Sequence, residues 1–283
     1  MTPAAGSGRQ RASAGLRLDL QGPVATVTLN RPDVLNAQTP AMWSALREFG
    51  RQLTGDIRIV IIRGEGRSFS AGLDLAVAGV LAPGGGASGD TATAGADPDS
   101  GNGGSFAALV TLPPEEAAGR IAVFQEAFSW LRRPDLVSIA AVQGHAVGAG
   151  FQLALACDFR VLTEDAQLSM AEIRLGLVPD LGGTKRLLDL VGYARALEIC
   201  LTGRRVGAAE AARIGLANLV VAPAELDGAV RDLADSVLAA RRDAVVEIKA
   251  LLAAGSGRDF AAQEAAERAA QVRRIRDLAG LGD

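Results

Sequence analysis

The sequence predicts an α/β protein that ends in a helical segment. Strand-like segments alternate with segments of helical spacing up to about residue 223, which is typical of an α/β core. From about residue 224 onward the spacing is helical throughout. We therefore expect a core at 15–223 and a C-terminal helical segment at 224–283, preceded by a disordered lead of small and polar residues at 1–14.

The first part of the core begins with a hairpin. LRLDL and VATVTLN alternate apolar and polar residues and flank the turn pair Gln21-Gly22. Residues 41–53 have helical spacing, and the apolar run at 57–64 is typical of a buried strand. Residues 82–105 contain almost no large apolar side chains, so they cannot bury enough surface to offset the entropy of ordering. We expect a flexible insertion there.

The rest of the core continues the alternation. Pro113–Arg132 opens with Pro-Pro-Glu-Glu, a favourable first turn for a helix. The remaining predicted elements are strands at 136–142, 159–163 and 216–221, and helices at 148–156, 184–190 (capped by Thr184), 193–201 and 207–214.

Composition excludes several classes of function. A net charge of −3 and an isoelectric point near 5.4 argue against a nucleic-acid partner. The single histidine, His145, makes a histidine-based zinc site improbable, and neither a P-loop nor a dinucleotide fingerprint is present. No apolar run is long enough to span a membrane, and residues 1–15 lack the apolar core of a signal peptide, so a cytoplasmic location is expected.

Two segments, 59–75 and 138–155, have the form strand, small-residue turn, helix. Small residues let the backbone approach a ligand, and a helix start offers unpaired N–H groups and the positive end of its dipole. Two such N–H groups converging on one carbonyl oxygen would stabilise an enolate or a tetrahedral oxyanion. The loss of one donor of this kind costs roughly 2.7–4 kcal/mol.

The motifs within these segments resemble a known family. SAGLDL at 70–75 and GHAVGAG at 144–150 are similar to the paired segments with which enoyl-CoA hydratases/isomerases, the crotonase family, hold a thioester carbonyl. RPDVLNA at 31–37 and residues 203–221 also fit the family, and the resemblance runs from about residue 16 to 221 with a break at 82–105. It implies the crotonase (ClpP-like) spiral of ββα repeats. It also implies an acyl-CoA thioester substrate, with no cofactor beyond the CoA of the substrate itself.

By position, the resemblance makes the N–H groups of Leu73 and Ala149 the oxyanion-hole donors. The competing interpretation is that the glycines of these segments only permit tight turns. The resemblance implies further contacts with substrate or CoA at Val34, Leu35, Ala71, Gly72, Asp74, Gly148 and Gly150. It also implies a homotrimer or a dimer of trimers, in which the helical tail helps to cover the CoA site.

The acid–base residues depart from the hydratase pattern. Glu172, in SMAEIRLG, matches the second catalytic glutamate of the family. Gln152 stands where hydratases carry the first, and an amide can orient water but cannot exchange a proton near neutral pH. Alternatives are a surface position for Glu172 and a helix position aimed away from the pocket for Gln152.

Asp180, in GLVPDLGGT, follows Glu172 by eight residues. Hydratases usually have a small residue here, whereas some dienoyl-CoA isomerases have an aspartate that works with the glutamate. The alternative is an Asx turn before Gly182. An aryl-CoA dehalogenase of the superfamily pairs such an aspartate with a histidine, but His145 lies at a different position and is expected to be a turn residue.

We therefore expect an enzyme that shifts a double bond in an enoyl- or dienoyl-CoA. Glu172 would be the base, Asp180 would handle the second proton, and Gln152 would position water or substrate. Two alternatives stay open: a hydratase in which Glu172 acts beside Gln152, and a non-catalytic acyl-CoA binding protein. The sequence does not select an acyl group.

Overall fold

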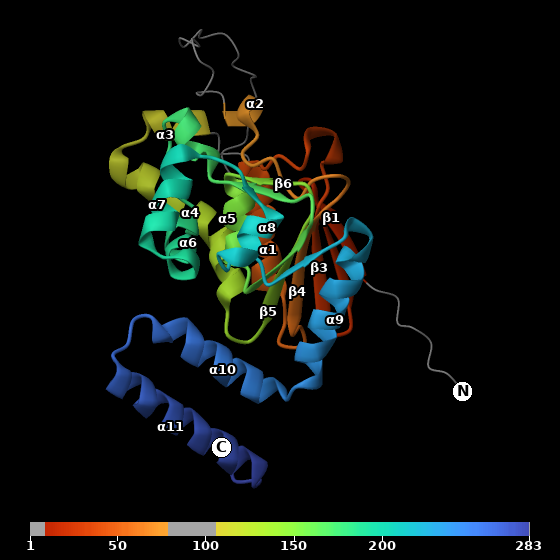
Figure 1. Ribbon diagram of the computed structural model, residues 1–283, viewed down its shortest axis with the longest axis vertical. Helices are drawn as coiled ribbons and strands as arrows, with labels where there is room; N and C mark the ends of the chain where they lie inside the picture. The colour runs from red at the N-terminus through yellow and green to blue at the C-terminus, as the bar shows by residue number, and fades with distance from the viewer. Residues whose placement is uncertain (1–8, 79–105, 283) are drawn as a thin grey trace, which may run out of the picture.

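The computed structural model describes residues 9–78 and 106–282, which form a sheet with helices packed on both faces (Figure 1). The main sheet has seven strands in the order β1-β2-β3-β4-β5-β7-β10; the first three are antiparallel and the others join in parallel. Their bounds are β1 (Arg9–Ser13), β2 (Leu16–Gln21), β3 (Val24–Leu29), β4 (Ile59–Gly64), β5 (Val137–Val142), β7 (Phe159–Thr163) and β10 (Leu219–Val221).

The described residues also form a second sheet of three short strands. It consists of β6 (His145–Val147), β8 (Gln167–Ser169) and β9 (Val206–Gly207), in the order β6-β8-β9. These strands are too short for their alternation to be recognised in the sequence. Because His145 lies in β6, its expected place in a turn is wrong.

The helices alternate with the strands as the sequence predicts. The α-helices are α1 (Pro40–Gln52), α2 (Leu75–Ala78), α3 (Phe106–Thr111), α4 (Pro114–Ser129), α5 (Ala149–Ala156), α6 (Gly183–Val191), α7 (Tyr193–Thr202), α8 (Ala208–Arg213), α9 (Leu226–Ala239), α10 (Arg242–Gly255) and α11 (Phe260–Leu278). Short 3-10 helices are η1 (Pro32–Val34), η2 (Trp130–Arg132), η3 (Ala171–Leu175) and η4 (Pro223–Glu225).

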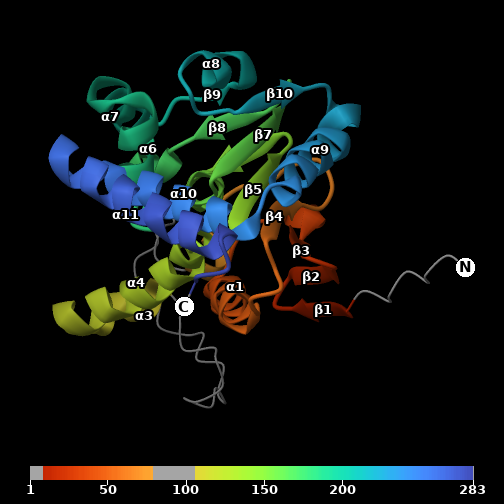
Figure 2. The same ribbon diagram turned by 90° about the horizontal axis from the view of Figure 1, so that it is seen from below.

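Each face of the main sheet has its own apolar core. On one face, α1, α4 and the fully buried α5 pack against the strands, with Trp43, Phe128 and Phe151 among the largest buried side chains. On the other face, Val230 and Ala234 of α9 pack against β5 and β7 (Figure 2). Strands covered on both faces are buried along their whole length, which is why β5 lacks an alternation of apolar and polar residues.

Two predictions need correction, and a third is not tested. Residues 9–13 form β1 against β2, so the disordered lead expected at 1–14 is wrong for that part, and residues 1–8 lie outside the described residues. Thr184 does not cap α6, because Gly182 is the N-cap residue and its φ of 86° turns the chain into the helix. The expected insertion at 82–105 also lies outside the described residues.

The C-terminal residues are helical as expected, but they divide into two parts. α9 belongs to the core, whereas α10 and α11 pack side by side beneath it (Figures 1 and 2). Lys249 fastens α10 to the core by donating hydrogen bonds to Asp158 Oδ2 at 2.6 Å and to the carbonyl of Leu136 at 2.7 Å.

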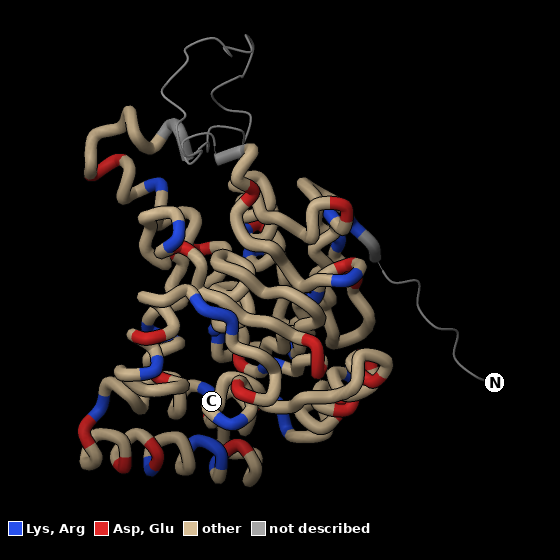
Figure 3. The backbone as a smooth tube through the Cα atoms, turned by 45° about the horizontal axis from the view of Figure 1, so that its top comes forward, with Lys and Arg blue, Asp and Glu red and all other residues tan. Residues whose placement is uncertain are grey.

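Neither a block of like charges nor a membrane-spanning helix is evident in the described residues. Lysine, arginine, aspartate and glutamate residues are interspersed along the described chain (Figure 3). Within the described ranges, no helix combines the length and apolar character needed to cross a membrane.

Candidate active site

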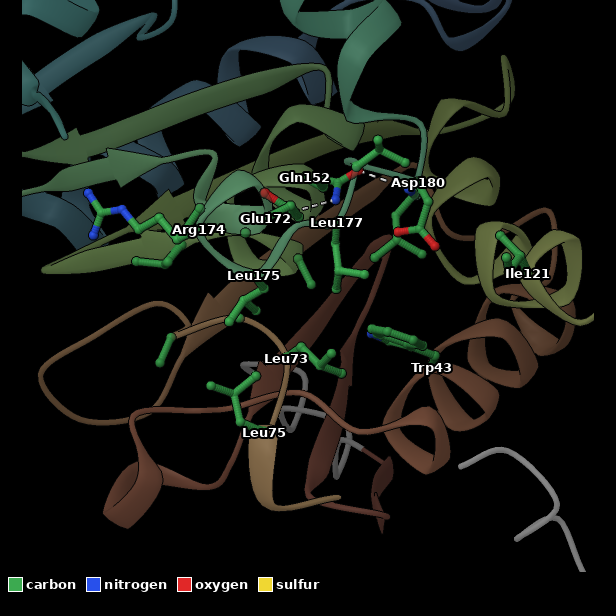
Figure 4. Close-up of a pocket in the computed structure, with 18 of the residues that line it drawn as sticks. Trp43, Leu73, Leu75, Ile121, Gln152, Glu172, Arg174, Leu175, Leu177 and Asp180 are labelled. Atoms are coloured by element: carbon green, nitrogen blue, oxygen red, sulfur yellow. Dashed lines mark hydrogen bonds between the residues drawn. The ribbon is translucent and has the colours of Figure 1, made fainter. Parts of the chain in front are cut away.

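A cavity of about 540 Å³ lies where the turns after β4 and β6 meet η3 (Figure 4). Most of its lining is apolar. The exceptions are the carboxyl groups of Glu172 and Asp180, the amide of Gln152 and the guanidinium of Arg174. The lining residues are Trp43, Ala71, Gly72, Leu73, Leu75, Leu109, Val110, Ile121, Val147, Gly148, Ala149, Gln152, Ala171, Glu172, Arg174, Leu175, Leu177, Val178, Asp180 and Leu181.

The backbone around Leu73 is held by Gln38 through a parallel bridge. The carbonyl of Gly72 accepts the Gln38 N–H at 2.6 Å, and the Asp74 N–H donates to the Gln38 carbonyl at 2.8 Å. In a trans peptide the N–H points opposite to the preceding C=O, so the Leu73 N–H points away from Gln38. Both residues of that peptide unit, Gly72 and Leu73, line the cavity.

Ala149 is the first residue of α5, so its N–H is one of the unpaired donors at a helix start. The Gly148 carbonyl accepts the Gln152 N–H at 2.9 Å along the helix, which turns the Ala149 N–H outward. Gly148 has a φ of 50°, a left-handed conformation that glycine adopts without strain.

The two donor segments touch at Gly72. Its φ is 90°, and a Cβ atom there would lie 2.4 Å from the Val147 carbonyl oxygen and 3.6 Å from the Ala149 nitrogen. Only glycine permits this approach, which brings the backbones of Leu73 and Ala149 together at one end of the cavity. Leu73 and Ala149 therefore lie on neighbouring segments of the cavity wall.

Glu172 and Gln152 form the polar centre of the cavity. The Gln152 amide nitrogen donates to Glu172 Oε1 at 2.7 Å, and the amide oxygen accepts the N–H groups of Leu181 at 2.9 Å and Gly183 at 3.2 Å. Because backbone N–H groups can only donate, this network fixes the orientation of the amide. Within the described residues, Glu172 Oε2 is buried and has no hydrogen-bond partner.

Both carboxyl groups are harder to ionise than usual. Burial raises the pKa of Glu172 above its ordinary value, an effect that the Gln152 hydrogen bond opposes and the charge of Asp180 reinforces. Burial likewise raises the pKa of Asp180. Figure 4 shows Asp180 on the side of the cavity that holds Trp43 and Ile121, whereas Glu172 lies beside Gly148, with Oε1 3.3 Å from where a Cβ atom of that glycine would be.

Comparison with known proteins decides the family. Two profiles described as enoyl-CoA hydratase/isomerase match residues 101–277 and 24–85. The carnitinyl-CoA dehydratase of Salmonella enteritidis PT4 is 38% identical over 248 residues, which cover 86% of this chain and 82% of that protein. The chain belongs to the enoyl-CoA hydratase/isomerase family.

Solved structures agree with this assignment. A protein from Thermobifida fusca YX, named as an enoyl-CoA hydratase and determined with CoA, is 47% identical, with a TM-score of 0.81 and coverage of 94% of this chain and 95% of that one. A structure from the same organism with acetoacetyl-CoA is 46% identical, with a TM-score of 0.82 and coverage of 93% and 96%. The predicted crotonase fold is thereby confirmed.

The other predicted residues of this hydratase/isomerase family member divide into two groups. Ala71, Gly72 and Gly148 line the cavity, whereas Val34, Leu35, Asp74 and Gly150 do not.

The four residues that do not line the cavity lie near it or make structural contacts. Val34 is exposed and Leu35 has left-handed backbone, and both lie in the loop beside the first donor segment. Asp74 forms an ion pair with Arg31 at 2.8 Å. Gly150 packs against Ser70, where a Cβ atom would lie 2.7 Å from the Ser70 Cβ.

The roles of two residues in this family member could not be predicted from its sequence. Trp43 lines the cavity, but its helical spacing with Met42 and Leu46 signals only a core face. Asn36 is fully buried, and its side chain bonds the backbone of Arg31, Glu65 and Ser68, which ties the 31–37 loop to the first donor segment. A left-handed φ of 56° is tolerated well by asparagine, which is the one local signal for this role.

Proposed function

We propose that the protein is an enoyl-CoA isomerase that shifts a double bond through a thioester enolate. The observation that carries this proposal is the placement of Glu172 and Asp180 on one apolar cavity, with the non-ionisable Gln152 amide against the glutamate. Two carboxyl groups with raised pKa values can each take and return a proton. The reaction as proposed needs no metal or redox cofactor.

The roles follow from position along the cavity. The N–H groups of Leu73 and Ala149 would bind the thioester oxygen and stabilise the enolate. Glu172 lies beside Gly148, at the end where the thioester carbonyl would sit, so its target would be the α-carbon, C2. Asp180 lies toward Trp43 and Ile121, the direction of a more distant acyl carbon (Figure 4).

The proposed step is balanced in atoms and electrons. Glu172 Oε2 takes a proton from C2 of a 3-enoyl-CoA, and the C–H bonding pair passes into the dienolate. Protonated Asp180 then gives its proton to C4, which leaves the double bond between C2 and C3. Exchange of both carboxyl protons with solvent then restores the site.

A substrate panel tests the proposal. Purified protein is incubated with crotonyl-CoA, a 3-enoyl-CoA and a 3,5-dienoyl-CoA while the conjugated chromophore is followed by absorbance. The proposal expects turnover of the 3-enoyl or dienoyl ester and slow hydration of crotonyl-CoA. Fast hydration of crotonyl-CoA without isomerisation would refute it.

A second candidate is a hydratase or dehydratase in which Glu172 acts on water. It is favoured by the names of the relatives, a carnitinyl-CoA dehydratase at 38% identity and enoyl-CoA hydratases at 46–47%. The Gln152 amide argues against a hydratase, because the amide is bonded to Glu172 Oε1 and cannot transfer a proton. In the same panel, tight binding of CoA esters without any turnover would instead indicate a non-catalytic binding protein.

We also propose an acyl-CoA ligand and a homotrimeric or dimer-of-trimers assembly. The CoA and acetoacetyl-CoA complexes of the Thermobifida fusca proteins support the ligand. Exposed apolar side chains on the paired α10 and α11, among them Ile248, Leu252 and Ile275, support association with further copies of the chain. Light scattering of the purified protein tests the assembly, and a monomer at assay concentrations would contradict it.

A further inference from the structure

We infer that Trp43 is a positioning residue for the oxyanion hole, acting through a buried relay of side chains. The inference rests on the proposed function, because it concerns the Leu73 N–H as a donor to the thioester. Trp43 lines the cavity, and its indole N–H donates to the side chain of Gln38, whose backbone bonds Gly72 and Asp74. It would therefore couple the fit of the acyl group to stabilisation of the enolate.

The relay consists of three side chains in sequence. Trp43 Nε1 donates to Gln38 Oε1 at 2.8 Å, and Gln38 Nε2 donates to Ser70 Oγ at 3.1 Å. Ser70 Oγ donates to the Asn36 carbonyl at 2.8 Å and accepts the Gly72 N–H at 3.2 Å. Each donor meets an acceptor, so the direction of every bond is determined.

Burial makes each link costly to remove. Trp43 is 2% exposed, Gln38 is 1% exposed and Ser70 is fully buried. A buried polar group that loses its partner is not compensated by water, so the neighbouring groups must shift to find a new one. Loss of the Trp43 N–H would leave Gln38 Oε1 without its donor and free the amide to rotate.

The relay ends on the peptide next to the one that carries the Leu73 donor. The Gly72 N–H is held by the Ser70 side chain, and the Gly72 carbonyl is held by the Gln38 backbone. The Leu73 N–H belongs to the same peptide unit as that carbonyl, so the Gln38 backbone contact sets its direction, while the Ser70 contact holds the adjoining Ala71–Gly72 peptide. Gln38 therefore holds the hole with both its backbone and its side chain.

The ring of Trp43 connects the relay to the substrate. Phe124 and Phe128 pack against it, with ring centroids at 5.1 Å and 6.0 Å, and the ring lines the cavity. An acyl group long enough to reach Trp43 would contact the indole ring whose N–H begins the relay. Contacts that strengthen the enolate complex raise kcat, whereas contacts shared with the ground state only lower KM.

Binding of a stable enolate tests the inference without turnover. Acetoacetyl-CoA ionises to an enolate, whereas butanoyl-CoA has the same chain length and remains a neutral thioester, so the ratio of their Kd values reports the hole. The ratio is measured by calorimetry at alkaline pH for the wild type, Trp43→Phe, Ser70→Ala and the double variant. Trp130→Phe is the matched control, because Trp130 is also buried and its Nε1 has no hydrogen-bond partner in the described part of the chain.

We expect Trp43→Phe and Ser70→Ala each to reduce the preference for acetoacetyl-CoA roughly tenfold, the scale of one buried hydrogen bond. The double variant should lose little more than either single one, because both act through the same chain, and Trp130→Phe should keep the wild-type ratio. If Trp43→Phe does not fold, as judged by its thermal midpoint, Ser70→Ala carries the test. Folded variants that keep the wild-type ratio would overturn the relay alone, whereas a wild type without the preference would overturn the oxyanion hole and the relay with it.

Discussion

The side-chain amide of Gln152 donates a 2.7 Å hydrogen bond to Oε1 of Glu172, while its own oxygen accepts two backbone N–H groups. One oxygen of Glu172 is therefore occupied, and the buried Oε2, which has no partner in the described residues, is left to take a proton. In the proposed mechanism, the amide that breaks the two-glutamate hydratase pattern would thus select Oε2 as the oxygen that acts as the base.

Replacing Gln152 with methionine removes the amide at nearly constant length. Since the amide hydrogen bond lowers the pKa of Glu172, its loss raises that pKa further. A base works only when it is ionised, so the acid limb of kcat/KM against pH should move to higher pH. An acid limb that stays in place or moves to lower pH would show that the Gln152 amide does not lower the pKa of Glu172.

Asp180→Asn should remove the acid that supplies the proton at C4. An amide cannot exchange a proton near neutral pH, so the variant has no group in that place that can protonate the dienolate. Isomerisation of a 3-enoyl-CoA should slow by about 10²–10⁴-fold in steady-state assays, the usual contribution of a general acid or base. An Asp180→Asn enzyme with wild-type isomerase activity would show that Asp180 is not catalytic and serves only in the turn before Gly182.

Gly72→Ala should disable the oxyanion hole. The new methyl group would lie 2.4 Å from the Val147 carbonyl oxygen, on a residue whose φ of 90° already disfavours a side chain. We expect kcat/KM to fall roughly 10²–10³-fold in steady-state assays, the cost of one lost donor. Gly228→Ala in α9 is the control, because a Cβ atom there meets nothing within 4 Å; equal losses in both variants would contradict the account.

Glu172→Gln should stabilise the fold at alkaline pH. Burial raises the pKa of Glu172, so the native state holds the proton more tightly than the unfolded state does. The free energy of unfolding therefore falls as pH rises from the ordinary pKa of 4.5 through the raised one, and the loss persists above it. Denaturant unfolding at several pH values should show the variant more stable than the wild type when alkaline and equal to it below pH 4.5; a less stable variant at alkaline pH would refute this.

Lys249→Met should loosen the attachment of α10. Lys249 is 12% exposed and donates to Asp158 and to the carbonyl of Leu136, so its loss should lower the free energy of unfolding by about 1.5–3 kcal/mol. Lys185→Met is the matched control, because its pair with Asp189 is an exposed i,i+4 contact worth about 0.2–0.5 kcal/mol. Comparable effects of the two changes in denaturant unfolding would show that α10 is not held by Lys249.

Much of the fold follows from local patterns in the sequence. The hairpin β2–β3, the buried strands β4 and β5 and the long helices have periodicity strong enough to be recognised. The strands β6, β8 and β9 have only two or three residues each, so they carry no period, and they form because flanking elements bring them together. The strand at 9–13 likewise depends on pairing with β2 rather than on its own composition.

The site could be predicted only where residues carry chemistry in a recognisable motif. Gly72, Gly148 and Glu172 lie in such motifs and meet at the cavity. Trp43 and Gln38 do not, because their roles depend on tertiary contacts that bring α1 and the preceding loop against the first donor segment. The orientation of the Gln152 amide depends in the same way on the N–H groups of the 181–183 turn.

The most direct test of the proposed reaction is the fate of hydrogen during conversion of a 3-enoyl-CoA in D₂O. If Glu172 removes a C2 proton and Asp180 supplies one at C4, mass spectrometry of the 2-enoyl-CoA product at early times should find deuterium at C4 and no added oxygen. The Glu172→Gln variant should form this product at least about a hundredfold more slowly. A product that has gained the elements of water as fast as it forms, or full conversion by Glu172→Gln, would contradict the account.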